Sequence, residues 1–496
     1  MTTPAWVQDA IFYQIFPDRF ARSERLPDIG FEAWDAPPTN HGFKGGDLYG
    51  IANKLDYLQD LGITALYLNP VFASASNHRY HTYDYYNVDP LLGGNDALRF
   101  LLDEAHQREI RVILDGVFNH ASRGFWQFHH VLENGIRSPY RDWFYFDTDR
   151  LQGRRRWGVY PTPEEMQALQ SGEDSLKAIG YRGWWNMPAL PKLNTNTPAV
   201  RTFIFEVAKY WIDFGIDGWR LDVPGEIDDD SFWQEFRYRV RQANKEAYIV
   251  GEIWHEAHRW LQGDQFDAVM NYLVTAAALS FCAGRYIDVE VVQKAGGLKD
   301  RVHRYMDAVG FANEVDRIMN LYRPEITRAQ LNLLDSHDMP RFLSCAGGDK
   351  NSLKLGWLFI MTIAGAPCIY YGDEIGVDGG HDPDCRKAFP WDESQWDHDV
   401  RAYTKELIAL RKNNPALRSG DHQRLLATDG IYCYSRSLEE DTLIVGMNAS
   451  ESPQQFDVAY EAKKVPQAVF GNASDLSVRD GRLRFTLPAR SGVVLG

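Results

Sequence analysis

The feature that most constrains the fold of this chain is a series of eight short apolar runs, with helical patterns between most of them. In chain order the runs occupy residues 10–16, 63–72, 111–120, 218–223, 247–254, 267–272, 330–338 and 365–374. Their apolar character is continuous and does not alternate, which is typical of strands buried on both faces. Eight strands that alternate with helices predict an α/β fold, the closed TIM (β/α)8 barrel. An open, doubly wound sheet is the alternative, but eight sequential units favour closure.

Two parts of the chain depart from this alternation. Far more residues than one helix needs separate the third run, which ends at 120, from the fourth, which begins at 218. A long insertion at the C-terminal end of a barrel strand usually forms a wall of the active site. After residue 420 short strands follow one another, and Asp480-Gly481 predicts a hairpin turn. The predicted domains are a barrel at 1–120 and 196–415, a subdomain inserted after its third strand at 121–195, and a C-terminal antiparallel β-sandwich at 416–496.

The overall composition excludes some partners and a disulfide framework. The formal net charge is −15, which would repel a phosphate backbone, so no nucleic acid is expected. Neither a membrane-spanning run nor a secretory signal is present, so we expect a cytoplasmic protein with no membrane partner, unless a signal peptide was removed. The five cysteines show no CxxC spacing, which favours reduced thiols. Aromatic residues make up 13% of the chain, and their flat rings suit the apolar faces of sugars, although most are expected in the core.

Polar residues close four of the apolar runs. They are Asp115, Asn119 and His120 in the third, Arg220 and Asp222 in the fourth, Glu252 in the fifth, and His337 and Asp338 in the seventh. Because barrel strands all end at one rim, these side chains should converge there. A single strand-end Asp could simply cap a helix or form a salt bridge. Several uncompensated carboxylates around one axis would repel each other, so the set favours a functional site.

The fourth and fifth runs suggest a division of roles between two carboxyls. Arg220 points to the same face of its strand as Asp222, and we expect it to lower the pKa of that carboxyl and keep it ionised, as a nucleophile requires. Glu252 follows the apolar stretch 247–251, where desolvation should raise its pKa, as a general acid requires. Two carboxyls with separated pKa values are the chemistry of glycoside hydrolysis. Their separation is expected to be roughly 5–5.5 Å, the spacing of a retaining enzyme.

The motifs that carry these residues resemble those of the α-amylase family of glycoside hydrolases over nearly the whole chain. In family order and at family spacing they are DGVFNH (115–120), GWRLDV (218–223), GEIW (251–254) and LLDSHD (333–338). The resemblance implies that Asp222 is the nucleophile, that Glu252 is the general acid/base and that Asp338 stabilises the transition state.

The resemblance also implies a set of substrate-binding residues. Those of the −1 subsite would be His78, the stacking Tyr80, His120, Arg220, His337 and Asp338, with Asp115 supporting Arg220. Glu226 and Trp254 would face the acceptor subsites, and Asp382 with Arg386 would bind a sugar further along the non-reducing side.

One segment indicates a branch of the family. LPKLN (190–194) resembles the MPKLN of the neopullulanase, cyclomaltodextrinase and maltogenic amylase branch. This resemblance implies hydrolysis of α-1,4 and in some cases α-1,6 glucosidic bonds, with some transglycosylation. The expected partner is an α-glucan oligosaccharide or polysaccharide, namely cyclodextrins, pullulan, starch or maltooligosaccharides. The sequence leaves the preferred glucan and the oligomeric state open.

The chain departs from the branch in three respects. Its first strand begins near residue 10, without the β-sandwich that commonly precedes the barrel, so a more open cleft and activity on pullulan or starch are expected. Branch members often bind calcium in the loop after the first strand, but here ARSERLPDIGF (21–31) offers few oxygen donors even with GGD (45–47). We therefore expect no metal at that position and no required cofactor, while calcium elsewhere stays open. His81 and Gly225 stand where the branch usually has Asp and Asn.

Two other functions are compatible with the same resemblance. A glucanotransferase or a trehalose synthase-type isomerase would employ the same three carboxyls, because a sugar instead of water can attack a covalent glycosyl-enzyme. A catalytically inactive scaffold subunit of an amino-acid transporter would be expected to carry a membrane anchor and degraded carboxyls. This chain shows no such anchor and keeps all three acids.

Overall fold

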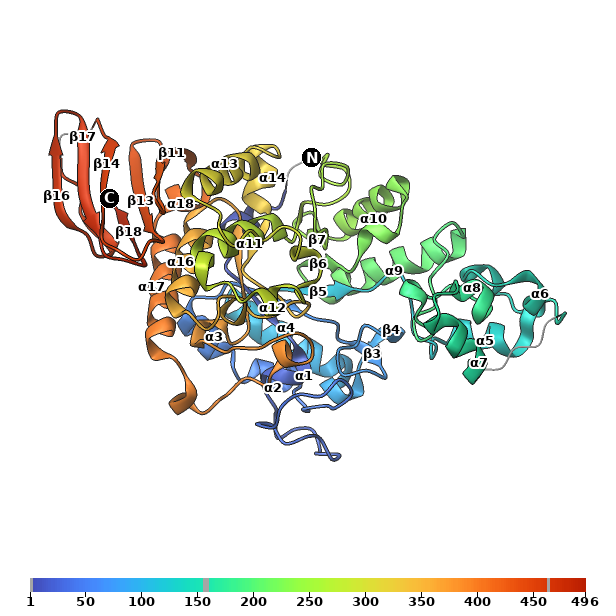
Figure 1. Cartoon of the computed structure of the whole chain (residues 1–496). Coiled ribbons are helices and arrows are strands. Elements are labelled where there is room, and N and C mark those ends of the chain that lie inside the picture. The colour runs from blue at the N-terminus through green and yellow to red at the C-terminus, as the bar shows by residue number, and fades with distance from the viewer. Residues whose placement is uncertain (1–2, 155–159, 462–463) are drawn as a thin grey trace.

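The structure of the chain is a computed structural model that describes residues 3–154, 160–461 and 464–496. A barrel occupies the middle of the molecule (Figure 1). The segment between its third and fourth strands projects at one end, and antiparallel β-sheets from the C-terminal part of the chain lie at the opposite end (Figure 1). None of the helices in these described ranges has the length and apolar character needed to cross a bilayer.

All eight predicted strands form one parallel sheet. They are β1 (Phe12–Ile15), β2 (Ala65–Leu68), β5 (Arg111–Gly116), β6 (Gly218–Leu221), β7 (Tyr248–Gly251), β8 (Ala268–Val269), β9 (Leu331–Leu333) and β10 (Ala366–Tyr370). Their order in the sheet is β8-β7-β6-β5-β2-β1-β10-β9. A parallel bridge between Met270 and Leu331 joins its two ends. The sheet therefore closes, which confirms the predicted barrel over the open-sheet alternative.

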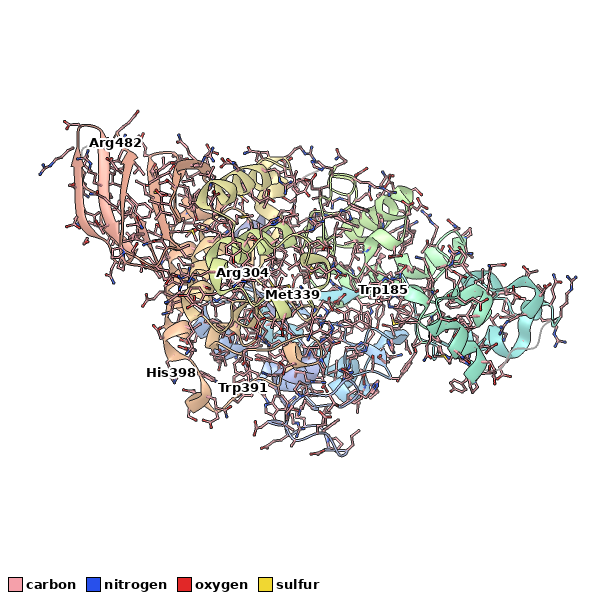
Figure 2. The ribbon with its side chains drawn as sticks, viewed as in Figure 1. Trp185, Arg304, Met339, Trp391, His398 and Arg482 are labelled. Atoms are coloured by element: carbon pink, nitrogen blue, oxygen red, sulfur yellow. The ribbon has the colours of Figure 1, made fainter. Side chains whose placement is uncertain are left out.

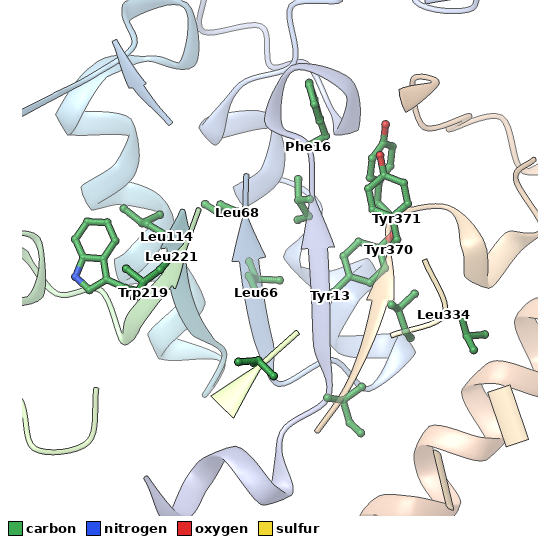
Figure 3. Packing of buried hydrophobic residues seen from close by; sticks show 14 of the residues in the cluster. Tyr13, Phe16, Leu66, Leu68, Leu114, Trp219, Leu221, Leu334, Tyr370 and Tyr371 are labelled. Carbon is green, nitrogen blue, oxygen red and sulfur yellow. The ribbon is translucent and has the colours of Figure 1, made fainter. Parts of the chain in front are cut away.

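The strands are apolar on both faces because each face packs against a separate hydrophobic cluster. Ala65 and Tyr67 of β2 belong to the cluster inside the barrel, which also contains Ile113. Leu66 and Leu68, the residues between and after them, belong to the outer cluster that packs against the helices. Figure 3 shows this outer layer from close by, with Leu66, Leu68, Leu114 and Trp219 standing on neighbouring strands. Continuous apolar runs in the sequence are the consequence of these two layers.

Helices cover the outside of the barrel. The main ones are α3 (Leu55–Leu61), α4 (Gly94–Gln107), α9 (Pro198–Phe214), α10 (Asp230–Ala243), α11 (Tyr272–Ala278), α13 (Ala308–Met319), α16 (Lys350–Thr362) and α17 (His398–Asn413). Local sequence fixes their ends. For example, α9 begins with a proline in its first turn and stops at Gly215, whose φ of 117° lies in the left-handed region.

The insertion consists of short helices that return to the barrel. It contains α5 (Trp126–Asn134), α6 (Thr148–Leu151), α7 (Pro163–Gln170) and α8 (Ser175–Ala178). Bridges from His120 to Lys192 and from Phe144 to Leu193 attach its last part, the LPKLN segment, beside the end of β5. A two-stranded sheet of β3 (Phe72–Ser74) and β4 (Thr82–Val88) flanks the loop that carries His78 and Tyr80.

The C-terminal part forms two antiparallel sheets. One contains β11 (Asp421–Thr428), β12 (Ile431–Leu438), β13 (Asp441–Asn448), β18 (Ser491–Leu495) and β15 (Ala468–Gly471); the other contains β14 (Gln454–Ala459), β17 (Arg482–Leu487) and β16 (Ser474–Arg479). The predicted Asp480-Gly481 turn joins β16 to β17, and both residues have positive φ, 53° and 74°, as a two-residue hairpin turn requires.

Candidate active site

Arg220 lies at the centre of the site and contacts three carboxyls. Its side chain is fully buried, and Nη1 lies 2.8 Å from Asp115 Oδ1 and 3.0 Å from Asp222 Oδ1. Its Nη2 lies 2.9 Å from Glu252 Oε2. Asp115 and Arg220 are register partners on β5 and β6, and Glu252 directly follows β7. Three adjacent strands therefore bring their carboxyls to one guanidinium.

The two proposed catalytic carboxyls differ in their remaining contacts. Asp222 Oδ2 is buried and has no hydrogen-bond partner in the described part of the chain. Both oxygens of Glu252 are engaged, since Oε2 accepts from Val223 N at 3.1 Å and Oε1 accepts from Trp254 Nε1 at 3.1 Å. Asp222 thus presents a free oxygen, whereas Glu252 is held in one orientation.

Val223 is a site residue that the sequence did not reveal. It follows Asp222 with φ 37° and ψ 49°, in the left-handed region that β-branched residues avoid. This turn aims its N–H at Glu252. Strained backbone of this kind persists only where the surrounding structure enforces it.

Asp338 lies in the loop after β9 and is more exposed than the other two acids. About a third of its side chain is accessible, 32%, compared with 7% for Asp222 and 5% for Glu252. His337 Nε2 lies 3.1 Å from Asp338 Oδ2, and Arg386 Nη2 lies 3.4 Å from its Oδ1. Asp338 is therefore oriented from two sides and faces the open part of the site.

Tyr80 connects the Arg220 cluster to this loop. Its hydroxyl donates to Asp115 Oδ2 at 2.8 Å and lies 2.6 Å from His337 Nε2. The Tyr80 and His337 rings are nearly parallel, with centroids 5.5 Å apart. Because the hydroxyl oxygen and Nε2 lie in these parallel ring planes and are only 2.6 Å apart, the rings meet edge to edge and not face to face.

Three further polar residues support this network and were missed from the sequence. Gln14 Nε2 lies 2.8 Å from His337 Nδ1 and donates to Asn69 Oδ1. Asn69 Nδ2 donates to the Tyr80 hydroxyl at 3.1 Å, and the Tyr67 hydroxyl donates to Asp115 Oδ2 at 2.9 Å. The sequence contained one indication of these residues: a glutamine and an asparagine lie in or next to fully buried strands, where polar side chains need hydrogen-bond partners.

Three stacked rings lead from the rim toward solvent. The His120 ring is buried and stacks on Trp184 with centroids 4.8 Å apart, and Trp184 stacks on Trp185 at 4.4 Å. Trp185 is 74% exposed and has a φ of 50°. It lies where the insertion meets the barrel (Figure 2).

The other expected binding residues surround this network. His78 Nδ1 accepts from Tyr80 N at 3.2 Å, and the Trp254 ring stacks on Tyr272 with centroids 3.7 Å apart.

Two ion pairs complete the surroundings. Lys192 of LPKLN lies 3.5 Å from Glu226 Oε2 and also donates to the backbone oxygen of Glu226 at 2.9 Å, so it joins the insertion to the loop after β6. Asp382 lies 3.0 Å from Arg386, whose Nε donates to His337 O. Asp382 thus reaches the site through Arg386.

Burial dominates the electrostatics of the site. It raises the pKa of Asp222 well above the usual range; Arg220 opposes the shift and the negative charge of Glu252 adds to it. Arg220 thus lowers the pKa of Asp222, as expected, but the expectation that this ion pair alone keeps the carboxyl ionised was wrong, because desolvation outweighs it. Burial also raises the pKa of Glu252, as expected, and raises that of Asp115 to about 6. It lowers the pKa of His337 well below the usual range, so this imidazole is neutral.

Comparisons with known proteins match nearly the whole chain. A family model described as "Alpha amylase, catalytic domain" matches residues 14–421, and one described as "Maltogenic Amylase, C-terminal domain" matches residues 424–494. A cyclomaltodextrinase from Bacillus sp is 43% identical over 90% of this chain and 73% of its own length. Two solved structures are also similar. A debranching enzyme from Nostoc punctiforme is 46% identical with a TM-score of 0.88, covering 100% of this chain and 99% of that one. The cyclic α-maltosyl-(1→6)-maltose hydrolase of Arthrobacter globiformis is 33% identical with a TM-score of 0.83, covering 100% of both chains.

Proposed function

The chain belongs to the α-amylase family of glycoside hydrolases, and from this premise we propose that it cleaves α-glucosidic bonds in glucans with retention of anomeric configuration. The observation that carries the proposal is the gathering of Asp115, Asp222 and Glu252 around the guanidinium of Arg220, with Asp338 beside them. The family assignment and the branch resemblance are supported independently by the match of both domains.

In the proposed first step, Asp222 attacks the anomeric carbon and Glu252 gives its proton to the glycosidic oxygen. The glycosidic bond breaks, the leaving sugar departs with that proton, and a covalent glycosyl-enzyme remains. Asp222 Oδ1 is held by Arg220, which leaves Oδ2 as the attacking atom. The raised pKa of Glu252 keeps its acid form available.

In the second step, Glu252 accepts a proton from water, and the oxygen of that water displaces Asp222 from the anomeric carbon. Two displacements on one carbon restore its configuration. Asp338 would bind sugar hydroxyls, with His337 and Arg386 fixing its orientation. These steps use side chains of this chain alone, so we propose that no cofactor is required.

The proposed substrates are α-glucans of the kinds expected from the branch: cyclodextrins, pullulan, starch and maltooligosaccharides. The names of two relatives support two kinds of glucosidic bond as targets. One is named a cyclomaltodextrinase, and another is named for a substrate that contains a (1→6) bond. We propose α-1,4 bonds as the main target and α-1,6 bonds as a second. A cytoplasmic location is proposed because all five cysteines are buried and unpaired, as in a reducing compartment.

The first prediction tests this chemistry. NMR of maltotriose hydrolysis should show the α-anomer as the initial product, and Asp222→Asn should lower kcat by a factor on the order of a thousand or more while leaving the far-UV spectrum unchanged. Asp213→Asn is the matched control, because that carboxyl is exposed on α9 and pairs with Lys209, away from the site. Initial release of the β-anomer, or an Asp222→Asn variant as active as the control, would contradict the proposal.

A further inference from the structure

A buried lysine ammonium lies inside the loop that follows β1. The Lys44 side chain is 0% exposed, and its Nζ donates to Ala33 O at 2.6 Å and to Ala36 O at 2.7 Å. Glu32 Oε2 lies 3.5 Å from the same nitrogen. Two carbonyls and a carboxylate therefore surround one cation, and they are the oxygen types that hard metal ions also prefer.

The chain around Lys44 is fixed at both sides. Lys44 N and Gly45 N donate to the two oxygens of the buried Asp18, at 2.9 and 3.1 Å. Arg22 donates to Lys44 O. The ammonium is thus held in place by the backbone as well as by its own acceptors.

The neighbouring GGD segment does not offer a site for a divalent cation. Asp47 Oδ2 accepts from Ser23 N at 2.7 Å, and Oδ1 accepts from Gly50 N at 2.8 Å. These N–H groups point at the oxygens that a cation would need, so both carboxylate oxygens of Asp47 are already occupied. The described residues contain no group of three or more His, Cys, Asp or Glu that could hold a metal ion. The donor set therefore does not fit the calcium that the resemblance associates with this loop.

The loop that Lys44 organises holds a segment of the active site. Asn77 is 3% exposed, and its Nδ2 donates to Asn40 O at 3.1 Å and to Gly42 O at 2.8 Å. Arg79 donates to Asn77 O at 2.7 Å, and the next residue is Tyr80, whose hydroxyl bonds to Asp115. Thr39 joins this segment to the ammonium pocket, since its hydroxyl donates to Glu32 Oε1 at 2.5 Å and accepts from Gly42 N at 2.9 Å. Contacts therefore run from the pocket to the catalytic cluster.

We propose that Lys44 is a positioning residue whose ammonium acts as an internal cation in place of a bound metal, orders the 32–44 loop and, through Asn77, holds Tyr80 against the catalytic cluster. Without the ammonium, Ala33 O, Ala36 O and the buried Oε2 of Glu32 would lose the positive charge that they surround, which is costly for buried oxygens. The loop would then rearrange and release Asn77. The effect on activity rests on the proposed role of Tyr80 in the site.

Chemical rescue of Lys44→Ala tests the proposal. The variant should lose about ten- to a hundredfold in kcat/KM on maltotriose, the scale expected for a small misplacement of site residues. Ethylammonium or propylammonium at tens of millimolar should restore part of the activity and raise its Tm, because either cation can enter the vacated space, whereas tetramethylammonium should do neither. Lys405→Ala is the matched control, since that lysine is exposed and pairs with Asp60. It should behave as the wild type in all three salts.

Two further experiments distinguish the ammonium pocket from a bound calcium ion and test the link through Asn77. A chelator should leave the Tm and activity of the wild type unchanged, and calcium should not rescue Lys44→Ala. Asn77→Ala keeps the ammonium pocket and should lower kcat/KM without any response to alkylammonium, which tests the link if Lys44→Ala folds poorly. An unimpaired Lys44→Ala variant, a folded one insensitive to alkylammonium, or a chelator-sensitive wild type with an ion mapped to residues 21–30 and 45–47 would overturn the inference. An inactive wild type would count against the proposed function, while the Tm response to alkylammonium would still test the pocket.

Discussion

At the scale of single residues, Arg220 sets the charge balance of the site. One guanidinium meets three carboxyls in a space with almost no solvent. Their mutual repulsion and their burial both favour protonation, so protons are shared across the group and are not fixed by one ion pair. Such a group can hold a proton for the leaving sugar at a pH where an exposed glutamate is ionised.

This charge balance predicts the pH dependence of the reaction. The reaction needs an ionised Asp222 and a protonated Glu252, and burial raises the pKa of both carboxyls. Because the two carboxyls are coupled, both limbs belong to the pair: activity should fall where the pair gains a second proton and where it loses its last one. Asp115, with a pKa of about 6, should contribute to the acid limb, since its protonation weakens the pair with Arg220. We expect a bell-shaped profile of kcat/KM for maltotriose, with both limbs above the ordinary carboxyl range of about 4. An acid limb at that ordinary value would show that burial does not control the site.

Residues that support the site from a distance could not be predicted from the sequence. Gln14 and His337 are separated by 323 positions, and their contact exists only because the barrel closes. By contrast, Asp222 and Glu252 each end an apolar run, so a local pattern marks them. The sign of the Asp222 pKa shift was missed for a related reason, because the depth of burial depends on the whole rim.

At the scale of elements, strand ends determine which side chains meet. The eight barrel strands were predictable because both of their faces are buried and their sequences are apolar throughout. Strand β11, an edge strand with mixed polar and apolar residues, gave no comparable signal, since much of it stays exposed. The turn between β16 and β17 was predictable because few residue pairs other than Asp-Gly accept two positive φ angles.

The strained turn after β6 can be tested by replacing Val223 with glycine. Val223→Gly removes the steric conflict at a φ of 37°, which costs of order 1–3 kcal/mol, and the half-buried valine side chain contributes little packing. We expect a Tm equal to or higher than that of the wild type and a kcat reduced several-fold, because the N–H that holds Glu252 becomes less fixed. Thermal unfolding and steady-state kinetics measure the two effects. A variant with lower Tm and unchanged kcat would show that the turn is structural and does not orient the acid.

At the scale of the whole molecule, the insertion and the barrel together shape the substrate site. The stacked rings from His120 to Trp185 place an exposed indole beside the rim, on the side of the insertion (Figure 2). Such a surface suits the sugars of a longer chain. Activity on polymeric glucans, expected from the sequence, stays a prediction.

That prediction is tested by comparing substrates of different size. Pullulan or soluble starch should be hydrolysed with a kcat/KM within about a thousandfold of that for maltotriose, a difference of ~4 kcal/mol. Trp185→Ala should lower the ratio of polymer to maltotriose by about two- to tenfold, since a lost aromatic contact costs roughly 0.5–1.5 kcal/mol, without changing Tm. Trp126→Ala, which removes an indole exposed elsewhere on the insertion, is the control. A polymer kcat/KM below that limit would contradict the open cleft. An unchanged ratio in Trp185→Ala would show that the polymer does not bind at this indole.

A retaining mechanism requires a covalent intermediate at Asp222, and trapping that intermediate tests the mechanism directly. The wild type and Glu252→Gln would each be incubated with a fluorinated glucosyl fluoride whose glycosyl-enzyme breaks down slowly, and the digested protein analysed by mass spectrometry. If Asp222 is the nucleophile, one glycosyl group should be added to the peptide that contains Asp222, and none after Asp222→Asn. A glycosyl group on Glu252 or Asp338, or turnover of the fluoride with inversion and without any adduct, would contradict it.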